Sequence, residues 1–377
     1  MSSTGELGAK LQDCLDCGVE EGLPGISAAI AGRAGLRWTG VSGLADINSH
    51  RYVRSDMLYG VGSITKTFIA VIVLQLAEEG HLQLHHTVAD VLGAAAEGVP
   101  NAEFATIAQL LRHTSGVPSW EDNPTWIRDG RGASLDVERI WDKTDALSYI
   151  AYHPPIGLPG EKFSYSNSNY TLLGLIIEKA TGQDLVREIK SRILEPLSLK
   201  DVYLEGFEPV PQDRLPHRYH WATANYGRVA GLNDAFREVR PGLIDVTCSN
   251  LSVEWAAGGI VATAGDLAVF GAALRDGKLL LPQSMRVMAD WSTIDKNRQI
   301  GHNLFREQQG HFTLIGHDGG VLGFSATLYW IERADAVVVA MSNVGNMHSG
   351  EVRKTLTSVV KRADFLETIL RFASSRL

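Results

Sequence analysis

Hydrophobic and polar positions divide the chain into strand-forming ends and a helix-forming middle. Strand-like runs occur at residues 26–31, 36–42, 311–315, 324–331 and 336–341. Apolar residues recur at intervals of three and four, the period of a helix, at residues 7–21, 106–113, 137–151, 169–181, 265–275 and 349–372. A more uniformly apolar run at 68–77 predicts a buried core helix, which Gly80 stops.

The order of these elements predicts an α+β fold. Strands at both ends with helices between them favour one antiparallel sheet, built from both termini and covered by the terminal helices. We therefore expect a discontinuous α/β sheet domain of residues 1–62 and 250–377, with a mostly helical domain inserted at 63–249. The cleft between two such domains is a usual place for a substrate site.

The charge of the chain narrows the choice of partner. Its 377 residues carry a net charge of −8, and acidic and basic residues are interspersed. Nucleic acids and anionic membranes both require a basic surface, so we expect neither as a partner. The apolar run at 68–77 is too short to span a bilayer. The sequence leaves the oligomeric state open.

Cysteine usage favours a reducing compartment. Cys14 and Cys17 form a C-x-x-C pair, but the chain has no second pair to complete a zinc site, so we interpret both as small residues near a helix face. With Cys248 the count is odd and gives no disulfide framework. The segment beginning at Met1 has neither the basic nor the apolar region of a secretory signal. We expect a cytoplasmic protein without a metal or other cofactor; a mature form whose signal has been removed is the open alternative.

A serine and a lysine stand one helical turn apart where a strand-like run meets the predicted core helix. In Gly62-Ser63-Ile64-Thr65-Lys66, the two side chains share a helix face, so the amine can reach the hydroxyl. Serine is a poor nucleophile until a neighbouring base takes its proton. The same spacing recurs at Ser358 and Lys361, but there it lies in a charged amphipathic segment and is typical of a helix surface. Context therefore favours Ser63 as the nucleophile.

A second cluster, Tyr165-Ser166-Asn167-Ser168, precedes an apolar helical segment. One interpretation is a helix start in which Ser166, Asn167 or Ser168 is the N-cap. The other is functional: the Tyr165 hydroxyl can move a proton to or from Ser63 if a nearby cation lowers its pKa. The Asn167 amide can hold the lysine side chain and a substrate carbonyl together.

A third cluster, Gly316-His317-Asp318-Gly319-Gly320, lies between two strand patterns. It fits a plain turn, and it also fits an edge strand that borders a cleft and offers an N–H to a substrate oxygen, because glycines in strands mark close backbone approach. In the second interpretation His317 adds a hydrogen-bond donor or a positive charge beside the tyrosine.

The order Ser-x-x-Lys, Tyr-x-Asn, His-x-Gly resembles the serine β-lactamase and penicillin-binding-protein superfamily. Tyr165-Ser166-Asn167 is similar to the second motif of class C β-lactamases, class C-type D-alanyl-D-alanine carboxypeptidases and family VIII carboxylesterases. His317-Asp318-Gly319 departs from Lys-Thr-Gly, but histidine is familiar there among peptidases, D-amino-acid amidases and esterases of this group. Residues 110–116, 257–260 and 320–324 also resemble family stretches, so the likeness covers nearly the whole chain. It implies a β-lactamase/transpeptidase-like fold.

The resemblance also implies roles for the three motifs. Ser63 attacks a carbonyl carbon and forms an acyl-enzyme. Lys66 and Tyr165 share the base and acid duties, and which of them takes the first proton stays open. The backbone N–H groups of Ser63 and Gly320 form the oxyanion hole.

The remaining residues of the motifs are expected to orient these groups. Asn167 would orient Lys66 and the substrate, His317 would support Tyr165, and Gly319 would border the bound substrate. Among the tryptophans, most of which we assign to packing, Trp120 and Trp126 follow the 113–116 turn in a loop and are the candidates for the wall of an acyl pocket.

The third motif has Asp318 where Lys-Thr-Gly has threonine, and this difference affects which substrate charge the site would favour. If Asp318 faces the cleft it repels a carboxylate and welcomes an amine, whereas on the other face of the strand it has no such effect. We therefore rank a small-ester or amide hydrolase above a β-lactamase. The alternative is a D-amino-acid amidase, or a D-aminopeptidase or D-Ala-D-Ala carboxypeptidase-like enzyme. A non-catalytic penicillin-binding receptor or scaffold, the alternative of another class, is disfavoured because Ser63, Lys66, Tyr165 and Asn167 are all present.

Overall fold

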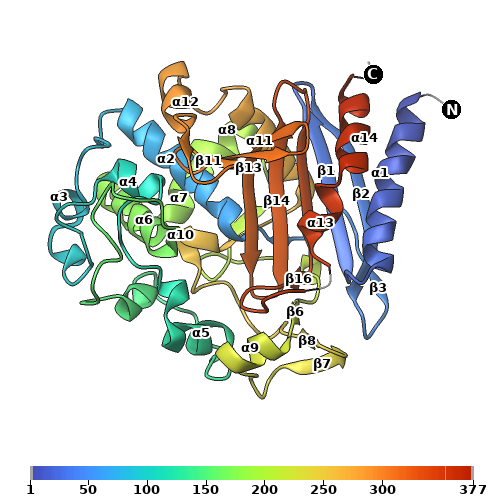
Figure 1. The fold of residues 1–377 in the computed structure, drawn as a ribbon, viewed down its shortest axis with the longest axis horizontal. Helices are drawn as coiled ribbons and strands as arrows, with labels where there is room; N and C mark the ends of the chain where they lie inside the picture. Colours follow the sequence, from blue (N-terminus) through green and yellow to red (C-terminus); the bar gives the residue numbers. More distant parts are fainter. Residues whose placement is uncertain (1–2, 353, 375–377) are drawn as a thin grey trace.

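One antiparallel sheet joins the two ends of the chain. In the computed structural model, which describes residues 3–352 and 354–374, this sheet has nine strands in the order β10-β11-β12-β13-β14-β15-β1-β2-β3 (Figure 1). Its strands are β1 (Gly25–Gly32), β2 (Gly35–Asp46), β3 (Arg51–Tyr52), β10 (Ser292–Thr293), β11 (Arg298–Ile300), β12 (Phe305–Gln309), β13 (Phe312–Val321), β14 (Phe324–Ile331) and β15 (Val337–Ser342). Because β1 pairs with β2 on one side and β15 on the other, the expected sheet built from both termini is confirmed.

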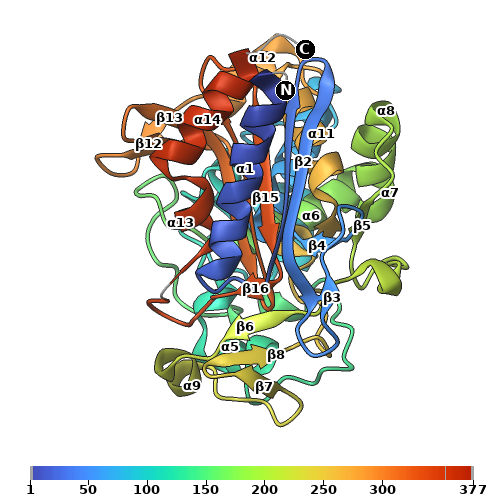
Figure 2. The same ribbon diagram turned by 90° about the vertical axis from the view of Figure 1, so that its right-hand side faces the viewer.

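Helices cover both faces of this sheet. Every residue of β1 is buried, and alternate side chains enter different cores: Ile26, Ala28 and Ile30 pack toward the terminal helices, Ala29 and Ala31 toward the opposite face. The terminal helices α1 (Ser3–Glu20), α13 (Leu356–Val360) and α14 (Ala363–Ser374) lie together over one face (Figure 2). Helix α11 (Ala264–Arg275) packs on the other. Burial on both faces explains why the central strands read as continuous apolar runs.

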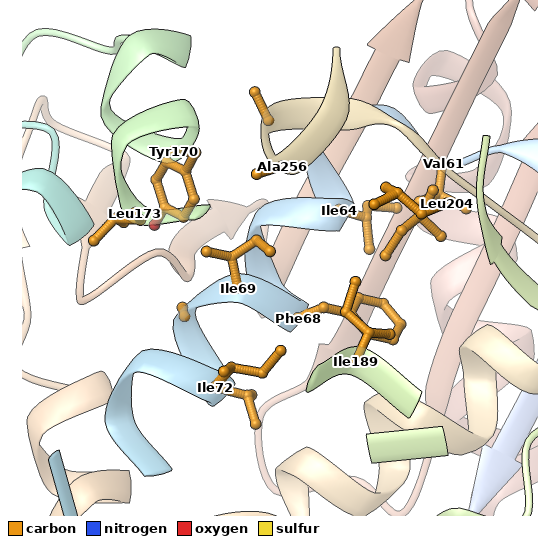
Figure 3. Packing of buried hydrophobic residues seen from close by; sticks show 14 of the residues in the cluster. Val61, Ile64, Phe68, Ile69, Ile72, Tyr170, Leu173, Ile189, Leu204 and Ala256 are labelled. Atoms are coloured by element: carbon orange, nitrogen blue, oxygen red, sulfur yellow. The ribbon is translucent and has the colours of Figure 1, made fainter. Parts of the chain in front are cut away.

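The helical region is centred on α2 (Thr65–Glu78), which begins directly after the short turn η1 (Gly62–Ile64). Almost all of α2 is buried, so its side chains pack in every direction. Phe68, Ile69 and Ile72 contact a core that includes Tyr170 and Leu173 (Figure 3). The surrounding helices are α3 (Val88–Leu92), α4 (Ile107–Leu111), α5 (Pro124–Arg131), α6 (Asn167–Thr181), α7 (Leu185–Ile189), α8 (Glu195–Leu197), α9 (Ala224–Val229), α10 (Trp255–Gly258) and α12 (Pro282–Met288).

Two small sheets depart from the expectation of a mostly helical middle. One has the order β16-β6-β8-β7 and the other β4-β9-β5. Their strands are β4 (Tyr59–Gly60), β5 (Val202–Leu204), β6 (Tyr219–Trp221), β7 (Arg237–Arg240), β8 (Leu243–Asp245), β9 (Ile260–Ala262) and β16 (Val344–Gly345). Strands of two to four residues show too little alternation to be recognised in a sequence, and their pairing with distant partners defines them.

The prediction of one continuous helix at 349–372 is wrong. The structure forms two helices, α13 and α14, which are separated at Lys361 and Arg362; residue 353 lies outside the described part of the chain. Lys361 is the C-cap of α13, and its ammonium pairs with Glu307 and Asp318 on the sheet. These tertiary ion pairs hold Lys361 where the helix turns.

The predicted helix at 137–151 is also wrong for most of its length. Only Asp145–Tyr149 forms a short 3₁₀ turn. The buried Trp141 donates its backbone N–H to the Ser252 hydroxyl at 2.9 Å, so a tertiary contact satisfies a group that a helix would have used.

Within residues 3–352 and 354–374, no helix combines the length and apolar character needed to cross a bilayer. Met1 and Ser2, where the search for a secretory signal began, lie outside the described residues. The division into domains at 62/63 and 249/250 stays a prediction.

Phe68 provides a test of how strongly α2 is anchored. Its side chain is fully buried and stacks on Phe270 with ring centroids 3.7 Å apart. We expect Phe68→Ala to lower the free energy of unfolding by about 3–5 kcal/mol, because it leaves a cavity in the core. Urea denaturation followed by tryptophan fluorescence measures the change. The matched control is Phe104→Ala, since Phe104 is 68% exposed and its loss should cost no more than about 0.5 kcal/mol. Equal losses for both variants would contradict the assignment.

Candidate active site

Two glycine-rich segments bring the first and third clusters together. Ser63 lies in η1, and Gly62 before it has a φ of +53°, which favours glycine. A Cβ added to Gly62 would lie 2.6 Å from the Gly320 nitrogen, and one added to Gly319 would lie 1.9 Å from the Val61 carbonyl oxygen. Neither position tolerates a side chain, so the backbone of β13 runs directly beside the Ser63 turn. The expected position of Gly319 and Gly320 next to Ser63 matches this geometry.

Lys66 lies directly behind Ser63. Its Nζ is 2.8 Å from the Ser63 Oγ and 2.6 Å from the Ala257 carbonyl oxygen, and the residue is fully buried. Burial lowers the pKa of Lys66 to about 7, although the negative charges of Glu121 and Glu254 oppose the shift. Near neutral pH, a large fraction of Lys66 is therefore a free amine within proton-transfer distance of the hydroxyl.

Tyr165 lies on the other side of the same pair. The Lys66 Nζ is 5.1 Å from the centre of the phenol ring, and the Tyr165 hydroxyl interacts with that of Ser63. Removal of the phenol from bulk water raises the pKa of Tyr165 above its usual value, and the interaction with Ser63 only partly opposes this. The condition set for proton transfer by this tyrosine, a pKa lowered by a nearby cation, is not met, because desolvation outweighs the other influences. The hydroxyl is protonated at neutral pH.

His317 approaches Tyr165 from β13, with ring centroids 6.3 Å apart. Its Nδ1 is 2.5 Å from the Asp318 carbonyl oxygen, which only accepts, so Nδ1 carries the hydrogen and Nε2 is an acceptor. Burial, followed by the nearby charge of Lys66, lowers the pKa of His317 to about 4. The imidazole is neutral near pH 7, so of the two expected contributions of His317, a hydrogen-bond donor or a positive charge beside the tyrosine, the positive charge is wrong.

A second histidine, which the motifs did not identify, stacks on the phenol. The rings of His113 and Tyr165 are 4.2 Å apart between centroids, and the His113 Nδ1 accepts a 3.1 Å hydrogen bond from the Ser166 N–H. Burial keeps the pKa of His113 well below its usual value. The family-like stretch 110–116 contains this residue, but only the fold places it against Tyr165.

Asn167 is not where its expected role requires. Its side-chain N–H donates to Glu121, and its backbone N–H donates to the Ser119 hydroxyl at 3.1 Å. Among the described residues, the carbonyl that holds Lys66 belongs to Ala257, and no hydrogen bond joins Asn167 to Lys66. The expected role of Asn167 in orienting Lys66 therefore has no support from a direct contact: its amide N–H is taken by the Glu121 carboxylate, and its buried amide oxygen has no hydrogen-bond partner among the described residues.

That carboxylate belongs to a buried charge cluster that sequence reasoning missed. Arg131 forms ion pairs with Glu121 at 2.5 Å and with Glu254 at 2.7 Å. Glu121 and Arg131 are ten residues apart and Glu254 lies 123 residues beyond Arg131, so the three form no local motif that a sequence pattern could identify. Glu121 nevertheless lines the same cavity as Ser63.

Trp120 and Trp126 are core residues and do not form the wall of a pocket. Both are fully buried, with ring centroids 4.4 Å apart. The Trp120 indole N–H donates to the Thr171 hydroxyl at 3.1 Å. The prediction that Trp120 binds substrate is wrong, because the loop folds this indole inward against α6, where Trp126 packs on it.

Asp318 is paired. Its carboxylate accepts hydrogen bonds from the Thr327 hydroxyl at 2.5 Å and from the Lys361 Nζ at 2.8 Å. The Lys361 side chain is only 11% exposed, so interpreting the Ser358–Lys361 copy of the motif as ordinary helix surface is wrong for the lysine. Lys361 also pairs with Glu307, so one ammonium is shared by two carboxylates, and all three side chains line the cavity beside Ser63.

A cavity of about 490 Å³ opens on Ser63 along the free edge of β13. Strand β12 pairs with β13 only as far as Gly316, which leaves His317 to Gly320 without a neighbouring strand on that side. The walls include Ser63, Glu121, Phe163, Tyr165, Phe305, His317, Gly320, Met347 and Lys361. In the described ranges 3–352 and 354–374, no group of three or more His, Cys, Asp or Glu side chains is arranged to hold a metal ion.

Known proteins that are similar to this chain include an esterase and two solved amide hydrolases. EstB, an esterase of Burkholderia gladioli, is 30% identical over 219 residues, which are 57% of this chain and 55% of EstB, so the match spans about half the length of that relative. A D-stereospecific amidohydrolase from Streptomyces sp. has 28% identity and a TM-score of 0.77, covering 90% of this chain and 94% of that one. The D-amino acid amidase from Ochrobactrum anthropi SV3, solved with L-phenylalanine amide, has 26% identity and a TM-score of 0.83, covering 96% and 98%.

The family model named Beta-lactamase matches residues 11–360, and this range contains Ser63 and all three clusters. The match confirms the superfamily that the motifs indicated. Since the model covers almost the entire chain, the protein belongs to the Beta-lactamase family.

Proposed function

We propose that this protein is a serine hydrolase that acts on a small ester or amide through an acyl-enzyme. The observation that carries the proposal is the buried Lys66 amine 2.8 Å from the Ser63 hydroxyl. As Oγ of Ser63 attacks the substrate carbonyl carbon, its proton moves to Lys66. The protonated Tyr165 hydroxyl gives a proton to the leaving alcohol or amine, and Lys66 returns its proton to the phenolate. Water then attacks the acyl carbonyl carbon, one of its protons returns to the Ser63 Oγ, and the carboxylic acid is released.

The oxyanion of the tetrahedral intermediate would be held by backbone N–H groups of Ser63 and Gly320. A Cβ at Gly319 would lie 3.1 Å from the Ser63 nitrogen, and one at Gly62 would lie 2.6 Å from the Gly320 nitrogen, so both donors lie at the same close approach of the chain. Donors fixed by backbone need no rearrangement as charge develops, which is the usual source of a large electrostatic contribution.

The cavity favours a small acyl group with an apolar part. Phe163 and Phe305 pack edge to face with centroids 6.4 Å apart, and the volume suits a small ligand. An esterase and two amidases among the similar proteins support both leaving groups. We propose ester hydrolysis as the first activity to test.

Glu121 favours a second candidate, an amide whose acyl group carries an amine. Its carboxylate lines the cavity with a side chain 12% exposed. Glu121, Arg131 and Glu254 together carry one net negative charge when all are ionised, which attracts an ammonium group. D-amino-acid amides fit this description. The Ser63–Lys66 pair supports an enzyme over a receptor or scaffold.

The compartment is proposed on separate grounds. Cys14, Cys17 and Cys248 are each free in the structure, which supports the predicted cytoplasmic location.

Ser63→Ala tests the nucleophile. We expect the variant to hydrolyse p-nitrophenyl butyrate at least about a thousandfold more slowly, because no other group can form the acyl-enzyme. The matched control is Ser358→Ala in the second Ser-x-x-Lys copy, which should retain full activity. Circular dichroism checks that both variants fold. Near-wild-type turnover by folded Ser63→Ala would refute the proposed function.

The pH profile tests Lys66 as the base. Its lowered pKa means that the amine is free above about pH 7 and protonated below it. We therefore expect kcat/KM for p-nitrophenyl butyrate to fall about tenfold per pH unit below that value and to level off above it. A profile that is flat from about pH 5 to about pH 9 would rule out Lys66 as the group that titrates.

Glu121→Gln tests recognition of an amine. We expect the ratio of kcat/KM for D-phenylalanine amide to that for p-nitrophenyl butyrate to fall about tenfold, because only the first substrate carries an ammonium group. Any effect of the substitution on Lys66 acts on both substrates and cancels in the ratio. An unchanged ratio would exclude Glu121 as the amine-binding group.

A further inference from the structure

A fully buried arginine lies behind the wall of the cavity. Arg131 ends α5, its side chain is 1% exposed, and its guanidinium contacts Glu121 at 2.5 Å and Glu254 at 2.7 Å. An unpaired charge at such depth costs several kcal/mol, so Arg131 requires these carboxylates. The packing around Arg131 is also fixed, because its carbonyl accepts a hydrogen bond from Tyr226 and its guanidinium lies 5.1 Å from the Trp126 ring.

One carboxylate connects Arg131 to the second motif. The Glu121 oxygen that does not face Arg131 accepts the side-chain N–H of Asn167. Asn167 is the first residue of α6 and follows Tyr165 by two positions. The position of Glu121 therefore affects the start of α6, which lies two residues after Tyr165.

The other carboxylate connects Arg131 to the group that holds Lys66. The Glu254 carbonyl accepts the Ala257 N–H at 2.8 Å, and a Cβ added to Gly258 would lie 3.2 Å from the Glu254 carboxylate. Between them Trp255 has a φ of +36°, which is strained for a residue with a side chain. The Ala257 carbonyl at the end of this turn accepts the Lys66 ammonium at 2.6 Å.

We propose that Arg131 is a positioning residue for the serine reaction: through Glu121 it places Asn167, and through Glu254 it fixes the strained turn whose Ala257 carbonyl holds Lys66 against Ser63. Arg131 itself contacts neither Ser63 nor the cavity. The proposal rests on the proposed function, because it presupposes that Ser63 is the nucleophile and Lys66 its base.

The same cluster sets the electrostatic field at Lys66. The other titratable groups that face Lys66 or Arg131 are His113, His317, Tyr165, Tyr170, His220, His348 and Tyr226. Burial lowers the pKa of each of these histidines and raises that of each tyrosine, so all seven are neutral near pH 7. The charges of Glu121 and Glu254 raise the pKa of Lys66 and that of Arg131 lowers it. Removal of the guanidinium therefore favours the protonated, inactive lysine.

The test compares two variants that change the cluster in opposite directions. In Arg131→Met we expect the midpoint of the kcat/KM profile for p-nitrophenyl butyrate to move up by about one pH unit. We expect kcat on the alkaline plateau to fall about a hundredfold with little change in KM, because Lys66 is misplaced. In Glu254→Gln the midpoint moves down, since a negative charge is lost. Arg131→Lys should restore part of kcat.

A matched control separates positioning from stability. Arg218 is also buried, pairs with Glu205, and lines a different cavity, so Arg218→Met removes a similar ion pair away from Ser63. It should lower the melting temperature without moving the pH midpoint. If Arg131→Met does not fold, Arg131→Lys and Glu254→Gln decide the question. Unchanged midpoints and unchanged kcat in folded variants of the cluster would overturn the proposal. Persistent activity in Ser63→Ala would instead overturn the proposed function, so the two failures are distinguishable.

Discussion

The burial of one lysine amine against one serine hydroxyl constrains the rest of this structure. Lys66 sits in the first turn of a helix that is apolar nearly all round, and that helix is held by the packing of Phe68 on Phe270. Removal from water lowers the pKa of Lys66 to about 7. A large fraction of the amine is thereby free to accept a proton near neutral pH. The Ala257 carbonyl and the Tyr165 ring both contact that desolvated nitrogen.

The site also requires that the backbone of β13 lie directly beside the turn that carries Ser63. The sheet edge can border Ser63 only because Gly62 and Gly319 lack side chains where η1 meets β13. The same edge is free because β12 stops pairing at Gly316. A strand edge with unpaired backbone donors next to an activated hydroxyl is suited to holding a carbonyl oxygen, which is why the proposed chemistry is acyl transfer.

Burial and ion pairing set the charge of the site. His317 and His113 flank the phenol as neutral rings, and Asp318 shares the Lys361 ammonium with Glu307. Arg131 divides its charge between two carboxylates, one of which reaches the cavity. Ion pairing and burial therefore leave the site less charged than its residue types suggest, and the carboxylates that line the cavity are those of Glu121, Glu307 and Asp318.

The sequence by itself determined the elements whose signals are local. Long periodic segments gave α1, α2, α6, α11 and the central strands, and the order of three short motifs gave the family and the residues around Ser63. Only the tertiary structure decided the rest. It buried Trp120, turned Asn167 toward Glu121, broke the last helix at Lys361 and made His317 neutral. The physical reason is that desolvation and ion pairing depend on which distant segments meet, and no residue carries that information in its own neighbourhood.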